Sequence, residues 1–151
     1  MDTMQPKKLI IINILDILKK YTDENHRLSQ KEISDILEKE YEKGNYVIAG
    51  GDFNQSFPGV LDKYPIADPK KWTPGVLEES ILPEGWQFAF DSSTPTCRLL
   101  DQPLSDACQR YVIDGFILSP NVQIDLVETL SEEFEYSDHN PVRLDVTLLS
   151  K

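Results

Sequence analysis

The sequence predicts an α/β protein, in which two N-terminal helices are followed by a mixed, mostly antiparallel sheet. Residues 1–43 carry apolar side chains at helical spacing, whereas residues 44–151 contain short segments with the apolar–polar alternation of strands. The chain has 151 residues, which suits one ordinary domain, and its 40% hydrophobic content is enough for a packed core. We therefore expect a helical segment at 1–43 and a sheet-forming segment at 44–151.

The first helix is expected to begin near Pro6, because proline fits the first turn of a helix. Lys19 and Lys20 suit its C-terminal end, where they complement the helix dipole. The residues between them form a broad apolar face: Leu9, Ile10, Ile12, Ile14, Leu15, Ile17 and Leu18. The polar stretch 22–27 then predicts a loop.

A second helix is expected from Ser29 to about Gly44. Ser29 and Glu32 match the capping box, in which each side chain accepts a backbone N–H of the other residue. Glycine commonly follows the last turn of a helix, which places the end near Gly44. Apolar residues at helical spacing lie between these limits: Ile33, Ile36 and Leu37.

Strands are expected in the remainder of the chain, at 46–49, 86–90, 111–118, 122–127 and 142–148. The last two alternate cleanly, which predicts one buried and one exposed face for each. Residues 55–85 hold five prolines and three glycines and predict long surface loops. Loops of such length in a compact domain commonly carry function.

The net charge of −11 is concentrated in the second segment. Residues 1–43 carry eight Lys/Arg against nine Asp/Glu, while residues 44–151 carry seven against seventeen. Such an acidic module repels polyanions, which argues against nucleic-acid binding by a basic face. Carboxylates do suit a site for a hard cation such as Mg²⁺, although a soluble acidic surface is the better explanation for most of them.

Two further features bear on the location of the protein. The longest apolar run, residues 9–12, is broken at Asn13 and Asp16, so we expect no membrane span, no signal peptide and a cytoplasmic protein. Cys97 and Cys108 are spaced wrongly for a zinc site, which two cysteines cannot supply alone. They could form a disulfide in an exported protein, but because we expect no signal peptide, we expect two free thiols.

Three polar segments lie where strands are expected to end or begin. Residues 51–54 (Gly-Asp-Phe-Asn) follow the first strand, Asp114 lies inside an apolar strand, and residues 137–141 (Ser-Asp-His-Asn-Pro) precede the last strand. A carboxylate in an apolar strand is costly unless it has a partner. Asp114 could orient His139 as a carboxylate does in an acid–base pair. The alternative is ordinary turn chemistry for the Asp and Asn residues and a structural histidine.

Taken in order, the motifs GDFN, IDGFILS and SDHNPV resemble the endonuclease/exonuclease/phosphatase superfamily of metal-dependent phosphoesterases. The resemblance covers roughly residues 42–151, about seven tenths of the chain. It implies that the sheet derives from half of a four-layer α/β sandwich. It also implies hydrolysis of a phosphate ester, with nucleic acid, inositol phosphate or a phospholipid headgroup as the possible substrate classes.

The same resemblance implies roles for individual residues. Asp52 corresponds to the carboxylate that positions or activates water, and Asn54 to the amide that holds the scissile phosphate. Asp114 corresponds to the acid paired with the catalytic histidine, His139. A metal ion neutralises phosphate charge in such chemistry, and histidine supplies a proton.

The metal and substrate contacts follow from the same comparison. Asp138, together with Asp52, corresponds to the acids that bind Mg²⁺ or Mn²⁺. Thr96, in the segment Thr94-Pro95-Thr96, corresponds to a substrate-side threonine.

The first half of the superfamily site has no counterpart before Asn45, where an early-strand Asn, a metal-binding Glu and a further His or Tyr are expected. We therefore expect impaired or absent catalysis. Half a sandwich also leaves an apolar face uncovered, which a homodimer could bury. Residues 4–41 resemble the first two helices of a WYL-type winged-helix regulator. A non-catalytic binding or regulatory module, or a chimeric fragment with a partial DNA-binding helix pair, is the alternative.

Overall fold

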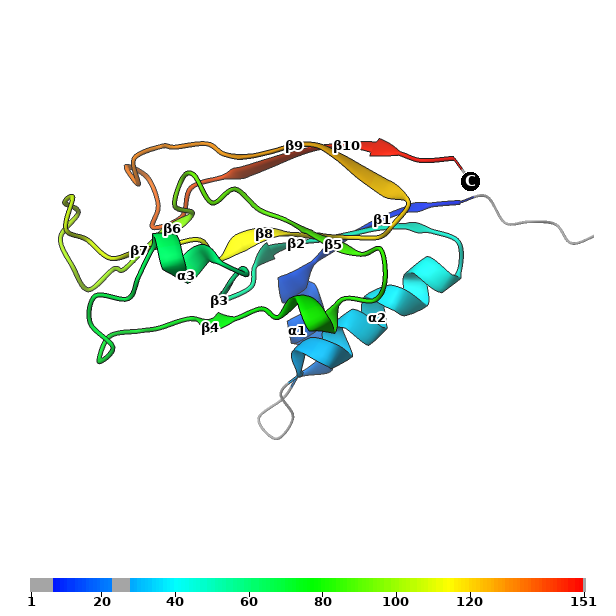
Figure 1. Ribbon diagram of the computed structural model, residues 1–151, viewed down its shortest axis with the longest axis horizontal. Helices are drawn as coiled ribbons and strands as arrows, with labels where there is room; N and C mark the ends of the chain where they lie inside the picture. Colours follow the sequence, from blue (N-terminus) through cyan, green and yellow to red (C-terminus); the bar gives the residue numbers. More distant parts are fainter. Residues whose placement is uncertain (1–6, 23–27, 151) are drawn as a thin grey trace, which may run out of the picture.

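A computed structural model describes residues 7–22 and 28–150, and its centre is a four-stranded sheet (Figure 1). The strand order is β1 (Leu9–Asn13), β2 (Tyr46–Asp52), β8 (Asp114–Leu118) and β5 (Gln87–Ala89). β1 runs parallel to β2, while β2–β8 and β8–β5 are antiparallel. The predicted α/β class with a mixed, mostly antiparallel sheet is confirmed.

The prediction of the first helix is wrong for the first half of that segment. Residues 9–13 form strand β1, and helix α1 begins only at Ile14 and ends at Tyr21. The β-branched run in residues 10–12 favours a strand once β2 supplies a parallel partner, with Leu9 opposite Tyr46. The side chain of Asn13 then accepts the N–H of Leu15 at 2.9 Å and caps the helix. Pro6 and most of the expected loop lie outside the described residues.

The second helix is confirmed, including its capping box. α2 spans Gln30–Glu42. The N–H of Ser29 donates to Glu32 Oε2 at 2.8 Å, and the N–H of Glu32 donates to Ser29 Oγ at 3.2 Å. Gly44 follows with φ of 86°, a left-handed backbone that glycine adopts without strain.

Two layers cover the opposite faces of the sheet (Figure 1). Helices α1 and α2 pack on one face, where Ile14, Ile17 and Leu37 join Val47 and Ala49 of β2 in one hydrophobic core. The other face carries the antiparallel pair β9 (Val122–Thr129) and β10 (Val142–Leu148), which buries a second cluster. The N-terminal segments are therefore joined to the C-terminal segment, β1 through the sheet and α1 and α2 through the core beneath it.

The remaining elements are short. The expected strand at 111–118 is interrupted, because Val112 and Ile113 are buried without ladder pairing between β7 and β8. The long 55–85 region is mainly irregular, as predicted. The short elements are β3 (Gln55–Ser56), α3 (Val60–Lys63), β4 (Gly75–Val76), η1 (Glu79–Ile81), β6 (Cys97–Arg98) and β7 (Arg110–Tyr111).

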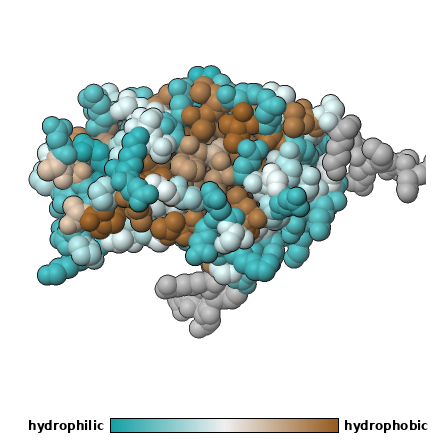
Figure 2. Space-filling view, in the orientation of Figure 1, coloured by the Kyte–Doolittle hydropathy of each residue, from teal (hydrophilic) through white to brown (hydrophobic). Residues whose placement is uncertain are grey.

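Apolar side chains remain exposed at the edge of the sheet. Ile11 of β1 is 72% exposed and Leu9 is 43% exposed. Figure 2 shows hydrophobic surface on the viewed face between the β9–β10 pair and the four-stranded sheet. Across the described residues, no helix is long and apolar enough to cross a membrane.

Candidate active site

Two carboxylates face each other where β2 ends and β8 begins. Asp52 and Asp114 are directly opposite in the antiparallel register. The approach depends on Gly50, because a β-carbon there would lie 2.4 Å from the Phe116 ring. Gly51 has φ of 134°, which strongly favours glycine. The two glycines therefore place Asp52 at the strand end beside Asp114.

His139 lies between these carboxylates. Its Nδ1 is 2.8 Å from Asp114 Oδ2, and its Nε2 is 3.8 Å from Asp52 Oδ2. The first contact is a hydrogen bond that fixes the ring. The structure thus brings together three of the residues predicted from the sequence.

The surroundings raise the pKa of two of these groups, His139 and Asp52. The hydrogen bond to Asp114, followed by one to Cys97, raises the pKa of His139 to about 11, although burial opposes the shift. Burial is the main cause that raises the pKa of Asp52, with the charges of Asp114 and Asp138 adding to it. A protonated imidazole beside a more basic carboxylate is a donor–acceptor pair suited to proton transfer.

Asn54 stands on a strained turn next to Asp52. Its backbone has φ of 51°, and its N–H donates to Asp52 Oδ1 at 2.7 Å. This local bond opposes the rise in the pKa of Asp52. The side chain of Asn54 is exposed, so its amide can reach a ligand from solvent.

Thr96 has a different place from the one predicted. Thr96 is 0% exposed. Its hydroxyl accepts the N–H of Ile113 at 3.0 Å and the N–H of Asp114 at 3.2 Å. A fully buried hydroxyl with these partners does not contact a substrate. We therefore correct the predicted substrate contact to a positioning role at the start of β8.

The turn that carries Asp138 and His139 is held by backbone bonds. The N–H of Arg98 donates to Asp138 O at 3.0 Å, and the N–H of Asn140 donates to Thr96 O at 2.8 Å. These bonds fix the residue between them, His139, against β6. An isolated β-bridge pairs Cys97 with His139.

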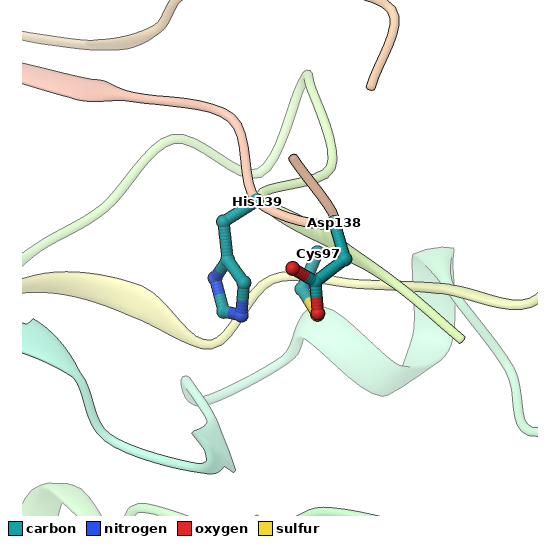
Figure 3. Close-up of side chains that lie close together, drawn as sticks. All are labelled: Cys97, Asp138 and His139. Atoms are coloured by element: carbon teal, nitrogen blue, oxygen red, sulfur yellow. The ribbon is translucent and has the colours of Figure 1, made fainter. Parts of the chain in front are cut away.

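Sequence reasoning missed two residues at this edge. Cys97 groups with Asp138 and His139, and their donor atoms all lie within 4.8 Å of one another (Figure 3). Its position directly after Thr96, a predicted site residue, was the feature of the sequence that could have indicated it. Asn13 ends β1 opposite Gly50. The helix prediction concealed this position at the end of a strand. Both cysteines are free, as predicted, and both are buried.

The expected Mg²⁺ or Mn²⁺ ligands, Asp52 and Asp138, both lie beside His139. Asp52 Oδ2 is 3.8 Å from its Nε2, and Asp138 precedes it in the chain. Mg²⁺ commonly takes one or two carboxylates and completes its shell with water and phosphate oxygens. Binding of such an ion by this pair stays a prediction.

No family model, curated protein or solved structure matches the chain. The relationship to the endonuclease/exonuclease/phosphatase superfamily therefore stays a prediction based on the three motifs, as does the resemblance of residues 4–41 to a winged-helix regulator.

Proposed function

We propose that the protein belongs to the endonuclease/exonuclease/phosphatase superfamily and is a divalent-metal-dependent phosphoesterase of reduced activity. The observation that carries the proposal is the position of His139, with Nδ1 2.8 Å from Asp114 and Nε2 3.8 Å from Asp52. A histidine oriented by one carboxylate and facing a second suits acid–base hydrolysis.

The protein groups have complementary roles in this proposal. Asp52 accepts a proton from the attacking water, because its raised pKa makes it a better base than an ordinary aspartate. His139, kept protonated by Asp114, donates to the oxygen on which negative charge develops. The exposed amide of Asn54 contacts the phosphate.

Asp52 and Asp138 would hold Mg²⁺ or Mn²⁺, which would neutralise phosphate charge at this edge of the sheet. Few protein ligands and an open site limit how firmly the reacting groups are positioned. Since positioning and preorganised charge supply most of phosphoryl-transfer catalysis, we expect slow turnover. The substrate is a phosphodiester or phosphomonoester, in the form of nucleic acid, inositol phosphate or a phospholipid headgroup.

A second candidate is a non-catalytic binding module, or a chimeric fragment that retains only such a role. The exposed edge of β1 favours it, because Leu9 and Ile11 would be covered by a partner. A second copy of the chain is the partner we propose for this edge. The DNA-binding version is less favoured, since Ile14 and Ile17 of α1 are used to pack on the sheet. A cytoplasmic location also remains a proposal, supported by two free thiols.

Hydrolysis of bis(p-nitrophenyl) phosphate during a Mg²⁺ titration tests the enzyme proposal. Asp52→Asn and His139→Gln should each abolish the metal-dependent rate. Asp125→Asn is the matched control, because Asp125 is exposed on β9 and its carboxylate bonds to Gln123 and Thr147. Equal rates in the wild type and both site variants would refute catalysis at this site.

A further inference from the structure

Cys97 gives this edge of the sheet a third kind of donor atom. The thiol, the Asp138 carboxylate and the His139 imidazole are all within 4.8 Å of one another. Across residues 7–22 and 28–150, no other group of three or more His, Cys, Asp or Glu side chains comes together in this way. Figure 3 shows a ring nitrogen of His139 facing the carboxylate of Asp138, with Cys97 beside it.

The three residues are held in place independently of any ligand. Cys97 and His139 are paired by a backbone bridge, and the carbonyl of Asp138 accepts the N–H of Arg98 at 3.0 Å. Asp114 binds Nδ1 of His139 at 2.8 Å and leaves Nε2 turned away from it. Histidines that bind metals usually have such a carboxylate on the other ring nitrogen.

The donor set selects the kind of cation. Sulfur, nitrogen and oxygen together suit a borderline-soft ion such as Zn²⁺, whereas Mg²⁺ prefers oxygen alone. Ligand atoms around tetrahedral zinc lie about 3.5 Å apart, so side-chain shifts of about 1 Å would close the group around one ion. Three protein ligands leave a fourth position for water.

We propose that Cys97, Asp138 and His139 bind a thiophilic divalent cation, with Zn²⁺ the best match. Binding forms one bond each from Sγ, an imidazole nitrogen and a carboxylate oxygen. The protons carried by the thiol and the imidazolium pass to solvent. Where the phosphoesterase proposal also holds, the same ion inhibits turnover, because it occupies His139 and takes Asp138 from Mg²⁺.

Cadmium is a suitable probe, since its bond to a thiolate absorbs in the ultraviolet. Titration of the reduced full-length chain with Cd²⁺ should give a band that saturates at one ion per chain. Zn²⁺ should remove the band, and excess Mg²⁺ should not. Asp114→Asn removes the carboxylate that orients His139 and should weaken binding about 10-fold.

The two cysteines provide matched variants, because both are buried and the chain contains no third. Cys97→Ser should abolish the band, and Cys108→Ser should keep it. Cys108→Ser is decisive even if Cys97→Ser fails to fold, because in Cys108→Ser only Cys97 can supply a thiolate. Either of two results would overturn the proposal. One is loss of the band in a Cys108→Ser protein whose circular dichroism spectrum is unchanged. The other is a band that persists in Cys97→Ser.

The metal-binding test needs no turnover and is separate from the test of catalysis. Saturable Cd²⁺ binding without hydrolysis would refute the phosphoesterase proposal alone. Hydrolysis that Zn²⁺ leaves unchanged, in a chain without a Cys97-dependent band, would refute the zinc site alone.

Discussion

The hydroxyl of Thr96 accepts the backbone N–H of Asp114 at 3.2 Å, and it does so from a fully buried position. The same oxygen accepts the N–H of Ile113 at 3.0 Å. One hydroxyl therefore accepts two backbone N–H groups at the start of β8, one buried and one part-buried. It also fixes the residue that orients His139.

We expect Thr96→Val to lower the free energy of unfolding by about 2–3 kcal/mol, because it takes this acceptor from one buried and one part-buried N–H group. Urea denaturation measures the change. Thr96→Ser keeps the hydroxyl and should lose much less stability. Equal losses in the two variants would show that the hydroxyl contributes no more to stability than the methyl group, which would contradict this role of Thr96.

The raised pKa of His139 predicts a pH-dependent contribution to stability. Its folded pKa of about 11 exceeds the ordinary value of 6.5, so the contribution is complete below 6.5 and is lost as the pH rises through about 11. The difference in unfolding free energy between the wild type and His139→Gln should therefore be largest near about pH 6 and shrink towards about pH 10. A difference that grows with pH would contradict this assignment.

Asp114 is the first cause of that raised pKa, so its replacement should lower it. NMR titration of the His139 ring in Asp114→Asn is the direct measurement. Asp125→Asn is a suitable control, because Asp125 is exposed on β9 and bonds only to neighbouring strand residues, Thr147 and Gln123. An unchanged His139 titration in Asp114→Asn would remove the basis of the proposed acid–base pair.

The exposed edge of β1 predicts self-association that a single charge disrupts. Ile11→Glu should reduce a concentration-dependent dimer seen by light scattering, without loss of stability, because the side chain is already 72% exposed. Leu104→Glu is the matched control, since Leu104 is 49% exposed in a loop distant in sequence. A wild-type chain that stays monomeric at all concentrations would refute the dimer.

The parts of the fold that depend on local chemistry could be predicted from the sequence. The Ser29–Glu32 capping box and the strand that begins at Tyr46 follow from residues that are only a few positions apart in the sequence. The segment 9–12 was misjudged because an unbroken apolar run fits either a helix face or a buried strand. Only its partner, β2, decides between them, and that partner is distant in the sequence.

The site was predictable to the extent that its chemistry follows from residue type and motif. Asp52, Asp114 and His139 were expected together, and the structure places them together. Cys97 was not expected there. Its approach to His139 depends on a bridge between β6 and the turn before β10, and no local pattern encodes that bridge.

The parallel pairing of β1 with β2 has a consequence for the order in which the chain folds. β9 and β10 pair antiparallel, whereas the parallel pairing of β1 with β2 needs a crossover connection, which contains α1 and α2. We therefore expect the β9–β10 pair to form before β1 joins the sheet. β1 also lies at the sheet edge, with one hydrogen-bonded neighbour. We expect it to detach first in local unfolding, so that its amides exchange with deuterium faster than those of β8, which is paired on both sides.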